Sequence, residues 1–193
     1  LAYVEWAGEG AQRLAVPWRV IDGAEAAQAF ANELAGQAGS RFLRGTSISS
    51  ALQFSAGLFE RDSTRRVIDI SGDGPNNAGG MVTVARDAVV AQGIVINGLP
   101  ILISPAQNFT TLDRYFADCV IGGEGAFALP VLSVGDLGEA IRMKLLRELL
   151  AAGGHGNGKG RVIFAAAEPP TDCLAGEKER QRRTDQYYPE LDK

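Results

Sequence analysis

Two glycine-containing loops carry side chains whose oxygen atoms could hold a metal ion. Thr46 follows Gly45 where a helix is expected to begin, and Asp73 follows an expected strand in the run Ser71-Gly72-Asp73-Gly74. Hydroxyl and carboxylate oxygens are the ligands that a small divalent cation prefers in proteins. The two loops therefore predict a metal site at Thr46 and Asp73. The residues expected near that site are Ser47, Asp69, Ser71, Gly74, Asn76 and Asn77.

Each loop also has a purely structural interpretation. Thr46 or Ser47 would serve as the N-cap of the helix that follows, because a hydroxyl there accepts a hydrogen bond from a free backbone N–H. The run Asp73-Gly74-Pro75-Asn76 is typical of a tight turn. An EF-hand calcium loop starting at Asp69 is excluded, since its twelfth position holds Gly80 instead of a glutamate.

The elements that must position these loops follow from the periodicity of apolar residues. Residues 1–7 and 12–21 have the spacing of a β-hairpin, and Asp22 is the expected N-cap of a helix over 24–35. Further on, strands alternate with helices, which predicts a doubly wound, mostly parallel α/β sheet with helices on both faces. The expected strands cover 65–71, 94–103 and 127–134, and the expected helices cover 47–59, 83–92, 111–119 and 136–152.

The chain of 193 residues has 46% apolar and 22% charged residues, which are ordinary globular values. We expect one compact domain over residues 1–152, a glycine-rich linker over 153–160, and a tail over 161–193. Within the tail, 161–167 is a candidate strand. The charged run 177–193 lacks an apolar period, which predicts disorder.

Composition excludes several classes of function. A net charge of −4 gives no basic face for nucleic acid, and no apolar run reaches the length of a membrane span. The single histidine, His155, lies in the glycine-rich linker, which argues against a Ser-His-Asp hydrolase and a histidine-rich zinc site. Cys119 and Cys173 leave two alternatives open: one disulfide in an exported protein, or two free thiols.

Charged and aromatic residues in the expected strands have ordinary interpretations. Glu5 and Asp69 lie inside strands, where a carboxylate is costly to bury unless it is paired. Arg13, Arg65 and Arg66 are the expected partners. Trp6 and Trp18 are expected to be packing residues.

The two loops also resemble those of a von Willebrand factor type A domain. The resemblance rests on Gly45-Thr46-Ser47-Ile48-Ser49 before an alanine- and leucine-containing helix, and on Val67-Ile68-Asp69-Ile70-Ser71-Gly72-Asp73-Gly74. The runs Tyr3-Val4-Glu5-Trp6-Ala7-Gly8 and Asp118-Cys119-Val120-Ile121-Gly122-Gly123 are similar to a bacterial, usually exported branch of that superfamily, whose function is unassigned. The resemblance covers about residues 1–150 and implies a Rossmann-like fold and a periplasmic or secreted protein.

The resemblance implies a metal-ion-dependent adhesion site built from three loops, which binds Mg²⁺ or Mn²⁺. Thr46 matches the second loop and Asp73 the third. The first loop, Asp-x-Ser-x-Ser, and the central strand before it have no counterpart upstream of Leu1, and Asp69-Ile70-Ser71 lies too late in the chain to replace them. We therefore expect a gapped sheet and millimolar or weaker affinity for Mg²⁺.

These observations favour a non-enzymatic protein-binding module that uses Mg²⁺ at the metal-ion-dependent adhesion site, incomplete in this chain, to engage an acidic group of a partner. The partner's carboxylate would fill the open coordination position of the metal. The alternatives are a metal-dependent α/β enzyme acting through Asp69 and Asp73, and a degenerate domain with a purely structural role. The identity of the partner and the oligomeric state are not specified by the sequence.

Overall fold

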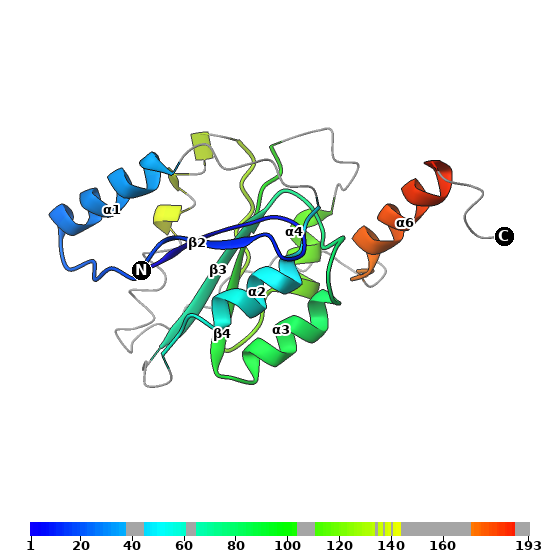
Figure 1. Cartoon of the computed structure of the whole chain (residues 1–193), viewed down its shortest axis with the longest axis horizontal. Helices are drawn as coiled ribbons and strands as arrows, with labels where there is room; N and C mark the ends of the chain where they lie inside the picture. Colours follow the sequence, from blue (N-terminus) through cyan, green and yellow to red (C-terminus); the bar gives the residue numbers. More distant parts are fainter. Residues whose placement is uncertain are drawn as a thin grey trace.

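A computed structural model describes residues 1–37, 45–60, 65–103, 111–133, 135–136, 138–139, 141–143 and 171–187. The described part is a mixture of helices and short strands, as expected of an α/β fold (Figure 1). In chain order its elements are β1 (Tyr3–Trp6), β2 (Gln12–Val16), α1 (Ala24–Gly36), α2 (Ile48–Ala56), β3 (Arg66–Gly72), α3 (Val82–Val90), β4 (Ile94–Pro100), α4 (Leu112–Tyr115), the π-helical turn η1 (Phe116–Val120) and α6 (Ala175–Tyr187).

The strands β3 and β4 form a parallel pair, as the alternation of strands and helices predicts. Arg66 lies opposite Ile94 at one end and Gly72 opposite Pro100 at the other. Almost all of β4 is buried, which is typical of a strand covered on both faces. The strand expected over 127–134 is reduced to two isolated bridges, from Ala128 to Gly98 and from Val131 to Ile101.

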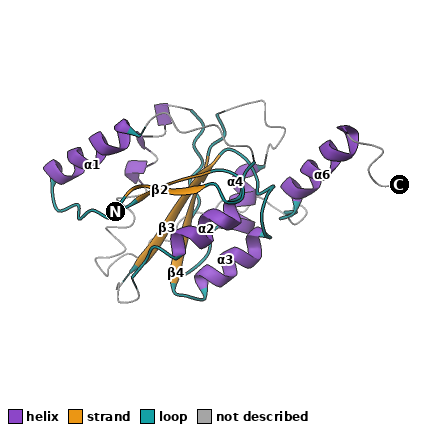
Figure 2. Cartoon of the chain, in the orientation of Figure 1, coloured by secondary structure: helices purple, strands orange, loops and turns teal. Residues whose placement is uncertain are grey.

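The strands β1 and β2 form a separate antiparallel hairpin, in which Trp6 lies opposite Gln12. Within the described residues the strands therefore make two sheets of two strands each, and a continuous doubly wound sheet is not formed. In Figure 2 the hairpin runs across the direction of β3 and β4. Side chains bridge the two sheets, because the ring of Trp6 lies so close to Gly72 that an added Cβ would come within 3.3 Å of it.

The core lies between the parallel strands and the helices α2, α3, α4 and η1. The helices α2 and α3 lie side by side along the strands (Figure 1). Tyr115 and Phe116 are the largest fully buried side chains. The other core residues are Ile48, Ala51, Leu52, Ala56, Ile68, Ile70, Val82, Val89, Ile94, Ile96, Leu112, Cys119 and Val120.

The first helix begins at Ala24 as expected, but its N-cap differs from the expected one. Its N-cap is Gly23, not Asp22, and Gly23 accepts the first backbone hydrogen bond of the helix from Ala27. An extended glycine can fill this position without a capping side chain. No residue of α1 is buried, so α1 adds little to the core.

The tail is ordered over α6, so the disorder expected from residue 177 is wrong for residues 177–187. Glu179 forms ion pairs with Arg182 and Arg183, three and four residues later, which supports a helix without an apolar period. A disulfide between Cys119 and Cys173 fixes the chain two residues before α6. The expected linker 153–160, the candidate strand 161–167 and residues 188–193 lie outside the described residues, and the helix expected over 136–152 is described only as far as residue 143.

Among the described helices, none combines the length and the apolar character needed to cross a bilayer.

Candidate functional site

The two loops singled out in the sequence lie side by side. The carbonyl of Thr46 accepts hydrogen bonds from the backbone N–H groups of Asn77 at 2.8 Å and of Ala78 at 3.2 Å. The N–H of Thr46 donates to the Asn77 side-chain oxygen at 2.8 Å. We call these two loops, residues 45–47 and 73–78, the rim. The rim brings together residues that are about thirty positions apart in the chain.

The rim is also joined to the hairpin. The backbone N–H of Ser47 donates to the carbonyl of Ala7, just after β1, at 2.8 Å. The side chain of Glu5 in β1 accepts from Arg13 at 2.6 Å, which confirms the expected ion pair. The hairpin therefore positions the rim from one side, while β3 leads into it from the other.

Asn76 holds the rim together from inside. Its side-chain oxygen accepts from the Ser49 N–H at 3.1 Å, and its amide nitrogen donates to the Gly80 carbonyl at 3.1 Å and to the Glu177 carboxylate at 2.7 Å. Its backbone N–H donates to the Tyr115 hydroxyl at 3.2 Å. Because Asn76 is fully buried, these bonds satisfy groups that would otherwise be costly to bury.

Ser47 is the N-cap of α2, as the structural interpretation allowed. Its hydroxyl accepts a hydrogen bond from the Ser50 N–H at 3.3 Å and contacts the Ser50 and Ser49 hydroxyls at 2.8 and 3.3 Å. Ser47 is fully buried. Its hydroxyl is therefore committed to the helix start.

Three of the predicted site residues are exposed on β3 or just after it. Asp69 and Ser71 share the exposed face of the strand, opposite Ile68 and Ile70, and Asp73 is exposed just beyond the strand. Asp69 accepts a hydrogen bond from the Asn97 amide at 3.2 Å, so one of its partners is an amide of β4, which the sequence did not predict.

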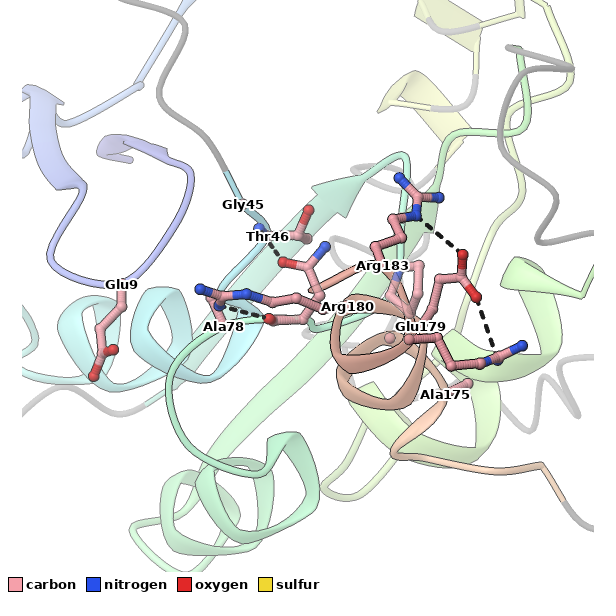
Figure 3. Close-up of a pocket in the computed structure, with 13 residues that line it drawn as sticks. Glu9, Gly45, Thr46, Ala78, Ala175, Glu179, Arg180 and Arg183 are labelled. Carbon is pink, nitrogen blue, oxygen red and sulfur yellow. Dashed lines mark hydrogen bonds and ion pairs between the residues drawn. The ribbon is translucent and has the colours of Figure 1, made fainter. Parts of the chain in front are cut away.

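A cavity of about 1020 Å³ opens beside the rim (Figure 3). Of the predicted site residues, Thr46, Gly74 and Asn77 line it. Its opposite wall comes from α6. The remaining lining residues are Glu9, Gly45, Pro75, Ala78, Ala175, Gly176, Glu179, Arg180, Arg182 and Arg183.

The helix α6 is fastened to the rim by close contacts. Gly176 packs so tightly that an added Cβ would lie 2.1 Å from the Asn76 carbonyl oxygen. Arg180 donates to the Asn77 carbonyl at 3.0 Å, and Figure 3 shows it reaching from α6 to the loop beside Ala78. The sequence reasoning missed this wall. The signal that could have found it is the cysteine pair, because a Cys119–Cys173 bridge requires the tail to return to the domain.

Two ionisable groups near the start of α6, Tyr115 and Asp172, have shifted pKa values. Burial raises the pKa of the Tyr115 hydroxyl well above its usual value; the hydrogen bond from the Asn76 N–H opposes this shift, and the Glu177 and Asp172 carboxylates add to it. The hydrogen bond from Lys178, supported by the Leu174 N–H, lowers the pKa of Asp172. One carboxylate oxygen of Glu177 is buried and has no hydrogen-bond partner among the described residues.

The described residues do not fit a complete Mg²⁺ site. Mg²⁺ requires near-octahedral oxygen coordination. In the part of the chain that the structure describes, no three histidine, cysteine, aspartate or glutamate side chains group closely enough to hold a metal ion. Ser47, the hydroxyl next to Thr46, is occupied by helix capping. Thr46 and Asp73 alone therefore leave most of the coordination shell to water.

Comparison with known proteins gives one family and two solved structures. The model of a family described as "Protein of unknown function (DUF1194)" matches residues 1–153. No curated protein matches the chain.

The structure of the conserved hypothetical protein BatB from Bacteroides thetaiotaomicron matches with a TM-score of 0.51 at 17% identity, over 77% of this chain and 78% of that one. An aerotolerance-related membrane protein from Bacteroides fragilis, with multiple mutations to serines, matches with a TM-score of 0.47 at 18% identity, over 76% and 78% of the two chains. The BatB likeness concerns the fold alone.

Proposed function

Since the chain belongs to the DUF1194 family, whose description assigns no activity, we propose that it is a non-enzymatic protein-binding domain of the von Willebrand factor A type. In this proposal the rim and the cavity beside it engage an acidic group of a partner protein. The partner's carboxylate enters the cavity next to Thr46.

The observation that carries the proposal is the composition of this cavity. Three arginines of α6 line it, against two glutamates, whereas the whole chain has a net charge of −4. A locally positive cavity on an acidic protein favours acidic ligands over basic ones. The position of Thr46 and the loop after β3 at this cavity supports the von Willebrand factor A assignment, as does the parallel pairing of β3 with β4.

Mg²⁺ has a minor role in the proposal. With Thr46 and Asp73 as the only assigned ligands, we expect millimolar or weaker affinity for Mg²⁺ and Mn²⁺ in this chain. The arginines and the backbone of the rim then account for most of the attraction for a carboxylate.

The proposal also places the protein in the periplasm or outside the cell. The Cys119–Cys173 disulfide supports this location, because such bridges persist in oxidising compartments.

The test measures binding of a tetraglutamate peptide by calorimetry, with tetraglutamine as the matched neutral control. We expect binding of the acidic peptide only, weakening as the salt concentration rises, and little change on addition of EDTA. Equal binding of both peptides, or of neither, would contradict the proposal. A separate titration with MgCl₂ or MnCl₂ tests the metal, where micromolar affinity would show that the assigned ligand set is wrong.

A further inference from the structure

We propose that the C-terminal helix α6 is a functional wall of the acidic-ligand site, and that the Cys119–Cys173 disulfide keeps this wall in place. Arg180 and Arg183 would then recognise an acidic peptide segment. The identification of the ligand as an acidic peptide rests on the proposed function. The attachment of α6 to the rim is independent of that function.

The contact between α6 and the rim is specific for glycine at position 176. A Cβ at this position would overlap the Asn76 carbonyl oxygen, at 2.1 Å, and approach Pro75 to 3.1 Å. Real Cβ atoms do not come this close to backbone oxygen. Any side chain here must push the helix away from the rim.

Polar contacts fix the orientation of the helix. Asn76 donates to Glu177 at 2.7 Å, and Arg180 donates to the Asn77 carbonyl at 3.0 Å. Just before the helix, the Cys173 carbonyl accepts from the Tyr115 hydroxyl at 3.4 Å. Thr171 also donates to the Asp118 carboxylate. These contacts span the first turns of α6 and the residues that precede it.

The helix depends on these contacts because it has little stability of its own. It has 13 residues, and Gly176 is its only buried residue. Isolated helices of about this length are marginal in water. Once detached from the rim, α6 should lose most of its helical hydrogen bonds.

The attached face of α6 carries the charges that line the cavity. Gly176, Arg180 and Arg183 follow one another at steps of four and three residues, so they share one face of the helix. The Arg183 side chain is 72% exposed and is paired with Glu179. An exposed ion pair of this kind is weak, so an incoming carboxylate can compete for the arginine.

Reduction of the disulfide is the step that would release the wall. Cys119 is fully buried and Cys173 is partly exposed, so a dithiol reductant reaches the sulfur of Cys173. A thiolate of the reductant attacks the Cys173 sulfur and forms a mixed disulfide with it. The Cys119 sulfur leaves as a thiolate, which takes up a proton. The second thiol of the reductant then attacks the mixed disulfide. The reductant becomes a cyclic disulfide, and Cys173 is released as a thiol. Two electrons and two protons pass to the protein in total.

The attachment is tested by hydrogen exchange on the full chain. Gly176→Ala is compared with Gly36→Ala, a helical glycine whose added Cβ meets nothing within 4 Å. Alanine raises the intrinsic helix propensity in both variants. We expect exchange over residues 175–187 to accelerate at least about tenfold in Gly176→Ala and to stay unchanged in Gly36→Ala. Unchanged exchange in Gly176→Ala would overturn the attachment.

The disulfide is tested in the same way. Cys119→Ser/Cys173→Ser, and the wild type treated with dithiothreitol, should both show the faster exchange over 175–187. Protection that survives in both samples would show that the bridge is not what holds α6.

Recognition is tested by binding of tetraglutamate to Arg180→Gln/Arg183→Gln. Arg142→Gln is the control, since Arg142 is exposed and lies outside the cavity lining. We expect about tenfold weaker binding for the double variant, in line with the loss of charge-assisted hydrogen bonds, and no change for the control. Equal binding by the double variant and the wild type would overturn the role of the arginines and leave the proposed function standing. Absence of binding by the wild type would overturn both, while the exchange result still decides whether α6 is attached.

Discussion

At the scale of single residues, the side chains that look like metal ligands mostly hold the rim together. Asn76 bonds to Ser49, Gly80 and Glu177, and Ser47 caps α2. A sequence cannot distinguish a metal ligand from a residue that joins two loops by hydrogen bonds, because both need a short polar side chain in a turn. Thr46 is the predicted ligand that faces the cavity.

Replacing Asn76 by alanine should therefore destabilise the fold strongly. The change removes three side-chain hydrogen bonds and leaves the Ser49 N–H without its partner in the interior. An unsatisfied buried group costs about 1–3 kcal/mol, so we expect a loss of about 2–4 kcal/mol in the free energy of unfolding. Urea denaturation measures it. The control is Asn32→Ala on the exposed helix α1, whose free energy of unfolding should stay within about 0.5 kcal/mol of the wild type. An equally small change for Asn76→Ala would contradict the role of Asn76 in holding the rim together.

Tyr115 should make the protein less stable in alkaline solution. Its pKa in the folded protein is raised by burial above the usual value of about 10. Above that pH the unfolded chain loses the phenolic proton first, so the folded state binds more protons and the free energy of unfolding falls as the pH rises. The contribution of Tyr115 to stability is complete at pH values below its pKa in the unfolded chain. It is lost as the pH rises through its pKa in the folded protein.

The measurement is the free energy of unfolding between about pH 9 and pH 11, compared with Tyr115→Phe. The variant should be less stable at neutral pH and should show a smaller fall above about pH 10. Parallel pH dependences would mean that Tyr115 does not carry the effect. Tyr187→Phe is the control, because Tyr187 is exposed.

At the scale of elements, the helices α1 to α4 and the pair β3–β4 are predictable, and the expected strand at 127–134 and the helix α6 of the tail are not. An apolar run such as Ile94-Val95-Ile96 indicates a buried strand by itself. Residues 127–131 instead form isolated bridges, from Ala128 to Gly98 in β4 and from Val131 to Ile101 just after β4. The helix α6 follows Cys173, whose disulfide partner Cys119 lies 54 residues earlier in the sequence, and no local pattern can reveal such a link.

Removing the cross-link should lower stability by an amount that grows with the logarithm of the length of the loop that it closes. For a sequence separation of 54, the chain-entropy relation gives a contribution of about 4 kcal/mol, and measured effects are commonly 2–4 kcal/mol. We expect Cys119→Ser/Cys173→Ser to lose about that amount in urea denaturation without reductant. Dithiothreitol should destabilise the wild type and leave the variant unchanged. Equal stability of wild type and variant would contradict a structural role for the bridge.

At the scale of the whole molecule, the described strands form two small sheets joined by side chains. Trp6 from the hairpin packs over Gly72 of β3, and Trp18 contacts Phe59 just after α2. The packing role expected of the two tryptophans is confirmed for Trp6, which packs against the core, whereas Trp18 contacts Phe59 and is 47% exposed. The contact of Trp6 with Gly72 links the two sheets through an aromatic ring, which strand periodicity alone could not predict.

Trp6→Ala should uncouple the hairpin from the parallel sheet. The variant retains Trp18 as a fluorescent reporter in the hairpin region, so its thermal transition can be compared with that of the helices followed by far-ultraviolet circular dichroism. We expect coincident transitions in the wild type and separate ones in Trp6→Ala, with the fluorescence change at the lower temperature. Coincident transitions in the variant would show that other contacts couple the two sheets. Val20→Ala, at an exposed position, is the control.

The disulfide also affects the local concentration at which α6 meets the rim. The helix and the rim belong to one chain, and the bond from Cys173 to Cys119 shortens the tether between them, which raises the local concentration at which the helix meets the rim. Short tethers produce effective concentrations in the millimolar range. A polar contact too weak to hold two separate molecules together can therefore stay formed in each single molecule. The attachment of α6 should then be independent of protein concentration.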